Sequence, residues 1–263
     1  MTRRLSHWIL FASVLLAPAL AFAGKKNGAV DDLNAATGGD ASFANRPLVL
    51  MIALGALGFA PFVLMMVTSF VKISVVLSVV RSALGTQQIP PTQVITGLAI
   101  ILTVYIMAPV GQEMFKAADN GEVAEGRSLM DAKNVDTLLS AANRSKEPLR
   151  AFLNKKVTKK DRQLFYGLAL KLRKPEDRAA ITENDFLILV PAFVVSELKE
   201  AFQIGFLLFV PFLVIDMVVA NILLALGMQM LSPTTISMPF KLLLFVLVDG
   251  WYMIAKGLVV GYL

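Results

Sequence analysis

The residues from Leu48 to Val80 form one predominantly apolar run in which Lys72 is the one charged residue, and the length of this run constrains the fold of the chain most. As one α-helix the run would be about 50 Å long, at 1.5 Å per residue. The hydrocarbon core of a bilayer is about 30 Å thick. We therefore expect that this segment is not one simple membrane span.

Three more apolar runs follow, at Val94–Val110, Phe186–Met230 and Ile236–Leu263. Hydrophobic residues make up 56% of the chain, whereas a soluble domain has about 45–50%. The composition favours a membrane protein or a deeply buried oligomer. We predict an all-α fold in which a first hydrophobic helical hairpin (residues 47–111) and a second one (residues 186–263) flank a small polar helical domain (residues 112–185).

The first 23 residues have the three parts of a secretory signal peptide: two arginines, a short apolar stretch and the small-residue site Ala21-Phe22-Ala23. An uncleaved anchor helix is the alternative. Cleavage before Gly24 would leave residues 24–46 as a flexible exported arm. It would also put the mature N-terminus and the polar domain outside.

Cleavage would remove the one histidine, His7, from a chain that has no cysteine. Thiol nucleophiles, histidine bases, Cys/His zinc sites and disulfides are then excluded. We expect no enzyme activity, no metal and no cofactor. The basic stretch of the polar domain contains Phe152, Phe165 and Tyr166, whose spacing suits the core of an amphipathic helix better than a nucleic-acid surface, so we expect no nucleic-acid partner.

The two hairpins share a faint repeat. A Pro-Phe pair is followed by Gly85 and then Pro-Pro-Thr in the first, and by Gly227 and then Ser-Pro-Thr in the second. Apolar hairpins also resemble each other by chance, so a true repeat and a coincidence both remain open.

Several charged residues lie inside the apolar runs. Those that we take as candidate functional residues are Lys72, Glu197, Asp216 and Asp249. A charge at the centre of a lipid-facing helix costs about 2.5–3.5 kcal/mol on insertion scales. Pairing inside one bundle would relieve this cost. We favour a different explanation, in which the helices are buried against other copies or line a wet cavity, so that these charges serve assembly.

Two long blocks of this sequence resemble the FliP/SctR family of type III secretion export-apparatus proteins. They are "FVLMMVTSFVKISVVLSVVRSALGTQQIPPTQVI" and "SELKEAFQIGFLLFVPFLVIDMVVANILLALGMQMLSPTTISMPFKLLLFVLVDGW". The resemblance covers the chain from about Leu48 to its end and is weakest in the polar domain. The cleavable signal is typical of the flagellar branch, whereas "ANILLALGM" and "SPTTIS" are more similar to the virulence branch, which we favour.

The resemblance implies a homopentamer whose hydrophobic hairpins sit mostly above the membrane plane and enclose a channel for unfolded secreted proteins. It implies partner subunits of the FliQ/SctS, FliR/SctT, FlhB/SctU and FlhA/SctV types. It also implies a methionine ring that seals the closed channel. Met228 and Met230 match the sealing motif, and Gln229 replaces its middle methionine. Thioethers are apolar and flexible, which suits a gasket. The runner-up function is a secondary transporter with broken helices, and an intramembrane enzyme is a further alternative.

Overall fold

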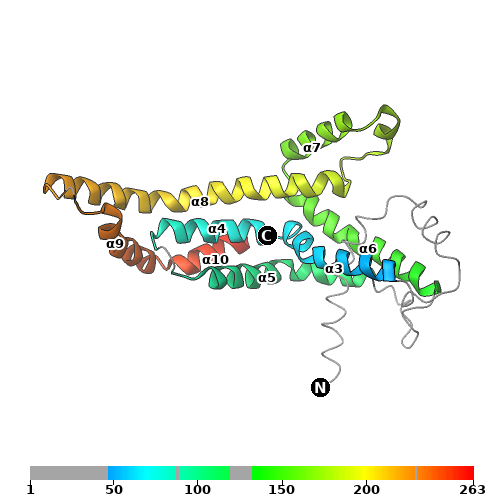
Figure 1. Ribbon diagram of the computed structural model, residues 1–263, viewed down its shortest axis with the longest axis horizontal. Coiled ribbons are helices and arrows are strands. Elements are labelled where there is room, and N and C mark those ends of the chain that lie inside the picture. Colours follow the sequence, from blue (N-terminus) through cyan, green and yellow to red (C-terminus); the bar gives the residue numbers. More distant parts are fainter. Residues whose placement is uncertain (1–46, 87–88, 119–131, 229) are drawn as a thin grey trace, which may run out of the picture. The chain divides into compact units, whose positions relative to one another are not determined.

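The computed structural model describes residues 47–86, 89–118, 132–228 and 230–263, and within these ranges the regular structure is helical throughout. The predicted signal peptide and arm therefore lie outside the described residues, as does Gln229. Figure 1 shows the helices, and their bounds are α3 Pro47–Met66, α4 Phe70–Ala83, α5 Thr92–Ala118, α6 Ala132–Lys156, α7 Lys159–Leu172, the 3₁₀ turn η2 Pro175–Ala180, α8 Phe186–Ala225, α9 Pro233–Leu247 and α10 Gly250–Val260.

The long first run is not a single helix. It is divided between α3 and α4 by a break at residues 67–69. At this break the Thr68 hydroxyl accepts a hydrogen bond from the backbone N–H of Phe70 (3.4 Å), which is the kind of local side-chain bond that competes with a continuous helix. Because the run is divided between two helices, no single helix has to be about 50 Å long.

Three other expected boundaries also differ. Helix α5 continues through Pro109 to Ala118, beyond Val110, where the second apolar run ends in the sequence. Helix α8 runs for 40 residues without interruption, through two prolines and the polar "SELKE" segment. The last apolar run is divided into α9 and α10, which are bent by 60°.

The chain packs as two compact units, each made of segments that are distant in sequence. Of the described residues, those up to Val67 and those of Ala108–Phe193 form unit 1, and those of Thr68–Met107 and Val194–Leu263 form unit 2. The break between α3 and α4 coincides with the limit between the units. This division reflects which segments pack together, not which are consecutive in sequence. The domain boundaries that we expect from the sequence stay a prediction.

In unit 1, α6 packs against the beginning of α8. The rings of Phe152 and Phe193 lie 5.9 Å apart between centroids, and the guanidinium of Arg150 lies 5.0 Å from the Phe186 ring centroid. Helix α7 begins at Thr158, whose hydroxyl oxygen accepts from the N–H of Asp161 (3.3 Å). This N-cap satisfies one of the free amides of the first turn.

In unit 2, one hydrophobic core joins α4, the first part of α5, α8, α9 and α10. Its fully buried members include Ile73, Val76 and Leu77 of α4. Gly205 of α8 allows a close approach to α4, because a side chain there would meet Val79 Cγ1 at 3.0 Å. The helices of this unit are the ones that position the candidate residues.

Two helices of the described chain, α5 and α8, are long and apolar enough to cross a membrane, and the bent pair α9–α10 makes a third if it counts as one span. These helices and the all-α fold agree with the expected hydrophobic hairpins.

Candidate functional site

The turn between α8 and α9 contains the two candidate methionines, and backbone hydrogen bonds define its shape. Gly227 has a φ of 73°, a left-handed conformation that glycine adopts without steric cost. Its N–H bonds to the Leu224 carbonyl (3.1 Å), and the N–H of Met228 bonds to the Leu223 carbonyl (2.9 Å). This pair of bonds is a Schellman motif, which satisfies the last carbonyls of α8.

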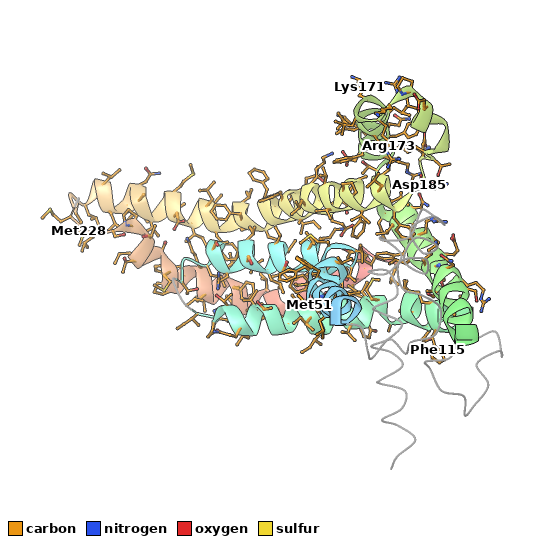
Figure 2. All side chains as sticks on the ribbon, turned by 45° about the vertical axis from the view of Figure 1, so that its right-hand side comes forward. Met51, Phe115, Lys171, Arg173, Asp185 and Met228 are labelled. Atoms are coloured by element: carbon orange, nitrogen blue, oxygen red, sulfur yellow. The ribbon has the colours of Figure 1, made fainter. Side chains whose placement is uncertain are left out.

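After the turn, α9 begins with Ser232 as its N-cap and Pro233 at its first position. Proline is favoured there because its missing N–H would have no helical partner. The two thioethers are therefore held on a short connection that is fixed at both ends. Met228 is 43% exposed and Met230 is fully exposed, and Figure 2 shows Met228 at the end of α8.

An ion pair joins the two helices on either side of this turn, α8 and α9. Lys241 Nζ lies 2.6 Å from Asp216 Oδ2, and the hydroxyl of Ser237 donates to the other carboxylate oxygen of Asp216. Lys241 Nζ also lies next to the turn after α4, where a side chain at Gly85 would come within 3.7 Å of it. We name Asp216, Ser237 and Lys241 the outer cluster.

A second cluster ties α4 to α8 and to the C-terminus. Lys72 Nζ lies 2.6 Å from Glu200 Oε2 and 3.2 Å from Glu197 Oε1, and the second of these contacts is an ion pair without hydrogen-bond geometry. The ammonium also lies over the Tyr262 ring, 4.4 Å from its centroid. The Tyr262 hydroxyl donates to Glu197 Oε2. We name Lys72, Glu197, Glu200 and Tyr262 the inner cluster.

Tyr262 stays a hydrogen-bond donor because its environment opposes ionisation. Burial first, and the neighbouring Glu197 carboxylate second, raise the pKa of its hydroxyl well above the ordinary value. The neutral phenol is therefore the form that bonds to Glu197 throughout the physiological pH range.

Asp249 lies at the bend between α9 and α10. Its φ and ψ are both 52°, a left-handed conformation that aspartate tolerates better than most residues. Its side chain is exposed and does not cap α10. The next residue, Gly250, packs against the Phe245 ring so closely that a side chain there would clash. Asp249 thus has a conformational role in the bend, and its expected pairing with another copy stays a prediction.

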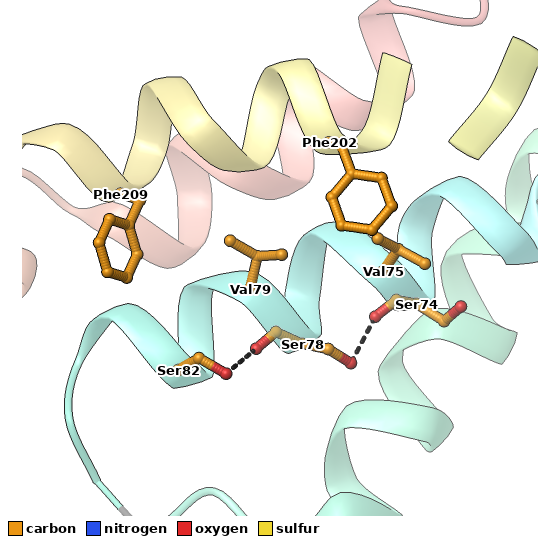
Figure 3. Close-up of a pocket in the computed structure, with 7 residues that line it drawn as sticks. All are labelled: Ser74, Val75, Ser78, Val79, Ser82, Phe202 and Phe209. Atoms are coloured by element: carbon orange, nitrogen blue, oxygen red, sulfur yellow. Dashed lines mark hydrogen bonds between the residues drawn. The ribbon is translucent and has the colours of Figure 1, made fainter. Parts of the chain in front are cut away.

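A groove of about 350 Å³ lies between α4 and α8 in unit 2. Figure 3 shows Ser74, Ser78 and Ser82 on α4 opposite Phe202 and Phe209 on α8. Each serine hydroxyl donates to a carbonyl of its own helix, at 2.7–3.0 Å. Because the serine donors are already used, the groove presents a largely apolar surface to its surroundings.

The structure brings Lys72 together with Glu197, and it places Asp216 with Lys241. It adds Glu200, Tyr262, Ser237 and Lys241, which the candidate set from the sequence lacked. The four-residue spacing of Ser237 and Lys241 on one helix face was a usable signal, whereas nothing in the local sequence pointed to Tyr262. In the described part of the chain there is no group of three or more His, Cys, Asp or Glu residues arranged to hold a metal ion.

Comparison with known proteins gives one family and a consistent set of relatives. The model of the FliP family matches residues 53–258. The chain is 44% identical to the flagellar biosynthetic protein FliP of Bacillus subtilis (strain 168), over 88% of this chain and 98% of that protein. It is 45% identical to the Yop proteins translocation protein R of Yersinia pestis, over 81% of this chain and 95% of that protein. It is 41% identical to the hypersensitivity response secretion protein HrcR of Ralstonia nicotianae, over 81% of this chain and 96% of that protein.

Proposed function

The chain belongs to the FliP family, and from this premise we propose that it is a core subunit of a bacterial type III secretion export apparatus. The observation that carries the proposal is the extent of the match, which runs from residue 53 to residue 258. The matched part contains the outer cluster, the α8–α9 turn and the inner cluster except for Tyr262. The relatives are named for flagellar biosynthesis and for secretion or translocation. Secretion or translocation stands in the names of two of these three relatives, and it is the activity that we propose for this chain.

We place the subunit in the bacterial inner membrane, mainly on the periplasmic side. The apolar helices α5 and α8 support a membrane location, and the predicted signal peptide supports the side. The identities to a flagellar and a virulence relative are 44% and 45%, so they do not separate the two branches. The proposed activity is conduction of unfolded proteins through a channel, with no catalytic reaction.

Five copies would form this channel together with subunits of the FliQ/SctS and FliR/SctT types, in contact with FlhB/SctU and FlhA/SctV types. The surface of α8 supports the need for neighbours, since Phe202, Phe206 and Leu207 are each more than 60% exposed. Apolar area of this kind is stabilised by lipid or by other protein subunits.

The α8–α9 turns of the five copies would form the seal of the closed channel. The two thioethers are exposed on a turn that is anchored at both ends, so several copies could present them to one axis. Apolar constrictions exclude hydrated ions by dewetting. Gln229 would either point away from the axis or make a polar ring that wets it in part.

The direct test of the export role is removal of the chain from its own bacterium. Export of flagellar or virulence proteins should stop while their synthesis inside the cell continues, and a plasmid copy should restore export. Normal export in the absence of the chain would contradict the proposal.

A separate test addresses the seal. Replacing Met228 and Met230 together by alanine should widen the constriction, so that small ions leak while protein export continues. Conductance of bilayers that contain the assembled complex measures the leak. The matched control replaces Met217 and Met253, which are 59% and 62% exposed elsewhere in the unit. A double variant that assembles and leaks no more than this control would show that the turn does not seal the channel.

The role of Asp249 in assembly is tested by two substitutions. Asp249→Asn removes the charge but tolerates the left-handed backbone, whereas Asp249→Leu also strains the bend. Both should lower the yield of complexes purified by size, with Leu the more severe, and Asp40→Ala in the predicted arm should have no effect. Full yield from both Asp249 variants would exclude pairing between copies through this carboxylate.

A further inference from the structure

The groove between α4 and α8 in unit 2 opens away from the hydrophobic core. Ser74, Ser78 and Ser82 are spaced by four residues, so they follow one side of α4. Ile73 and Leu77, on another side of the same helix, are buried in the core. Across the groove α8 contributes two phenylalanines (Figure 3). Because serine side chains are small, another helix can approach α4 closely along this line.

Helix α5 has the complementary shape, an exposed ridge. Ala99 of this helix is buried in the core, whereas Ile101 and Tyr105, on another side, are 66% and 69% exposed. Within unit 2, α5 lies on the other side of α4 from α8 (Figure 1). We name Ile101 and Tyr105, together with the exposed Ile100 and Val104 beside them, the α5 ridge.

The groove and the ridge also complement each other in hydrogen bonding. The three serine hydroxyls donate to carbonyls of their own helix, but each hydroxyl oxygen can still accept a hydrogen bond. The Tyr105 hydroxyl is a donor that makes no hydrogen bond within the described part of the chain. The groove therefore offers acceptors, and the ridge offers a donor that needs an acceptor once it is covered.

The spacing of the side chains matches as well. Residues four apart on a helix are separated by about 6 Å along its axis, and this holds for Ile101 and Tyr105 as it does for successive serines of the groove. A row of side chains at this spacing on one helix packs into the groove beside such a row on another. The ridge can therefore lie along the groove with Tyr105 next to a serine.

We propose that the α5 ridge of one copy packs into the α4–α8 groove of the next copy, with the Tyr105 hydroxyl donating to a serine oxygen of the groove. This inference rests on the proposed assembly of several copies. A closed ring needs two different and mutually complementary faces on each copy, and unit 2 carries both. Each copy thus fills the groove of one neighbour and has its own groove filled by the other.

Two other occupants fit the groove less well. Lipid acyl chains have no polar atoms, so they would leave the Tyr105 donor and the serine acceptors unpaired, which is unfavourable in an apolar environment. The same groove of a second copy would bring acceptors against acceptors and leave the α5 ridge uncovered. The ridge of a neighbouring copy satisfies the apolar surfaces and the hydrogen-bonding groups together.

The test uses the absence of cysteine from the chain. Two full-length variants with different affinity tags are produced together in the native bacterium, without the wild-type chain. One variant carries Ser74→Cys, Ser78→Cys or Ser82→Cys, and the other carries Tyr105→Cys. Membranes are treated with dibromobimane, a short thiol crosslinker that can occupy the space of the missing tyrosine ring. The matched control replaces Tyr105→Cys by Val246→Cys, at a site that is 73% exposed in the same unit.

We expect at least one serine position to give a product with both tags, at several times the yield obtained with the Val246→Cys control. Such a product can only join two copies. A chain with both Ser78→Cys and Tyr105→Cys should give a ladder of linked multimers, because every contact in a ring is repeated.

A second measurement removes the donor alone. Tyr105→Phe keeps the shape of the ridge and loses one hydrogen bond, so association of the copies should weaken about fivefold. Tyr252→Phe is the matched control, since Tyr252 is 56% exposed on α10, and it should leave association unchanged. The fraction of multimers after serial dilution of the purified protein in detergent measures both effects.

The size of the purified complex separates this inference from the proposed function. Multimers in which no serine position links to position 105 above the control would overturn the packing of ridge into groove and leave the proposed ring intact. Groove cysteines that are shielded from a thiol reagent but do not link would overturn it too, because lipid or another subunit then fills the groove. Single chains under all conditions would contradict the assembly itself, and this inference with it.

Discussion

The inner and outer clusters of unit 2 both hold α8 through a lysine, but they differ in burial and in charge balance. In the inner cluster Lys72 is 3% exposed and faces two carboxylates, of which Glu197 is completely buried and Glu200 is 42% exposed. In the outer cluster Lys241 is 5% exposed and faces one carboxylate, Asp216, which is 24% exposed. Water reaches one member of the outer pair, whereas the Lys72–Glu197 pair is closed to it.

This difference predicts unequal consequences when the lysine is lost. A buried charge without a partner is costly because neither water nor a counter-ion stabilises it, and breaking a buried pair costs about 3–5 kcal/mol. The inner cluster would also leave two like charges close together. Asp216 in the outer cluster is reached by water, so it can recover part of its hydration. The inner cluster should therefore matter more for stability, and the outer one for the local order of the α8–α9 turn.

The largest effect is expected for Lys72→Met. The side chain keeps a similar length and loses its charge, so the free energy of unfolding should fall by about 3–5 kcal/mol. Thermal unfolding of the purified protein in detergent, followed by circular dichroism, measures the change. Lys256→Met is the control, because Lys256 is exposed and lies 5.6 Å from the Tyr252 ring centroid.

Adding Glu197→Gln to Lys72→Met sharpens this test, because it removes the unpaired buried charge and should restore part of the lost stability. If Lys72→Met were no worse than Lys256→Met, the inner cluster would not contribute to the folded state in the way its burial indicates.

Lys241→Met should have a smaller effect on stability, about 1.5–3 kcal/mol, which is the range for a hydrogen bond to a charged group. The effect should concentrate at the α8–α9 turn, because Lys241 joins α9 to Asp216 of α8. Limited proteolysis should then cut near Ser232 earlier than in the parent protein. A loss as large as that of Lys72→Met would show that the two clusters are not distinguished by burial.

The smallest effect is expected for Tyr262→Phe. The ring that faces Lys72 remains and the donor to Glu197 is lost, so the expected cost is about 1 kcal/mol. The pKa of Tyr262 is raised in the folded state. Its hydroxyl therefore contributes its full stabilisation at pH values below the pKa of tyrosine in the unfolded chain, about 10. The advantage of tyrosine over phenylalanine should be constant below this pH and decline above it. Unfolding by denaturant at a series of pH values measures the difference in free energy of unfolding between the two proteins. A difference that declines between pH 6 and pH 9 would contradict the assigned hydrogen bond.

Local features were predictable from the sequence because a few neighbouring residues determine them. The apolar runs predicted an all-α chain with hydrophobic helices. Both repeat glycines, Gly85 and Gly227, have left-handed backbone angles, with φ values of 75° and 73°, at the end of α4 and just after α8. The two long sequence blocks also sufficed to predict the family, and the family comparison confirms this prediction. The sealing role of the methionines and the assembly role of the charges remain predictions.

Only the tertiary structure decided which charges meet and where the helices break. Lys72 and Glu200 are 128 residues apart in sequence, and no local pattern selects Glu200 or Tyr262 as partners of that lysine. Helix α8 stays continuous through Pro191 and Pro211, and α3 stays continuous through Pro61, whereas the first run breaks at Thr68 and Ser69, where there is no proline. The physical reason is that hydrogen bonds within a few residues set the conformation of a turn, whereas the cost of burying a charge depends on every side chain that the fold brings around it.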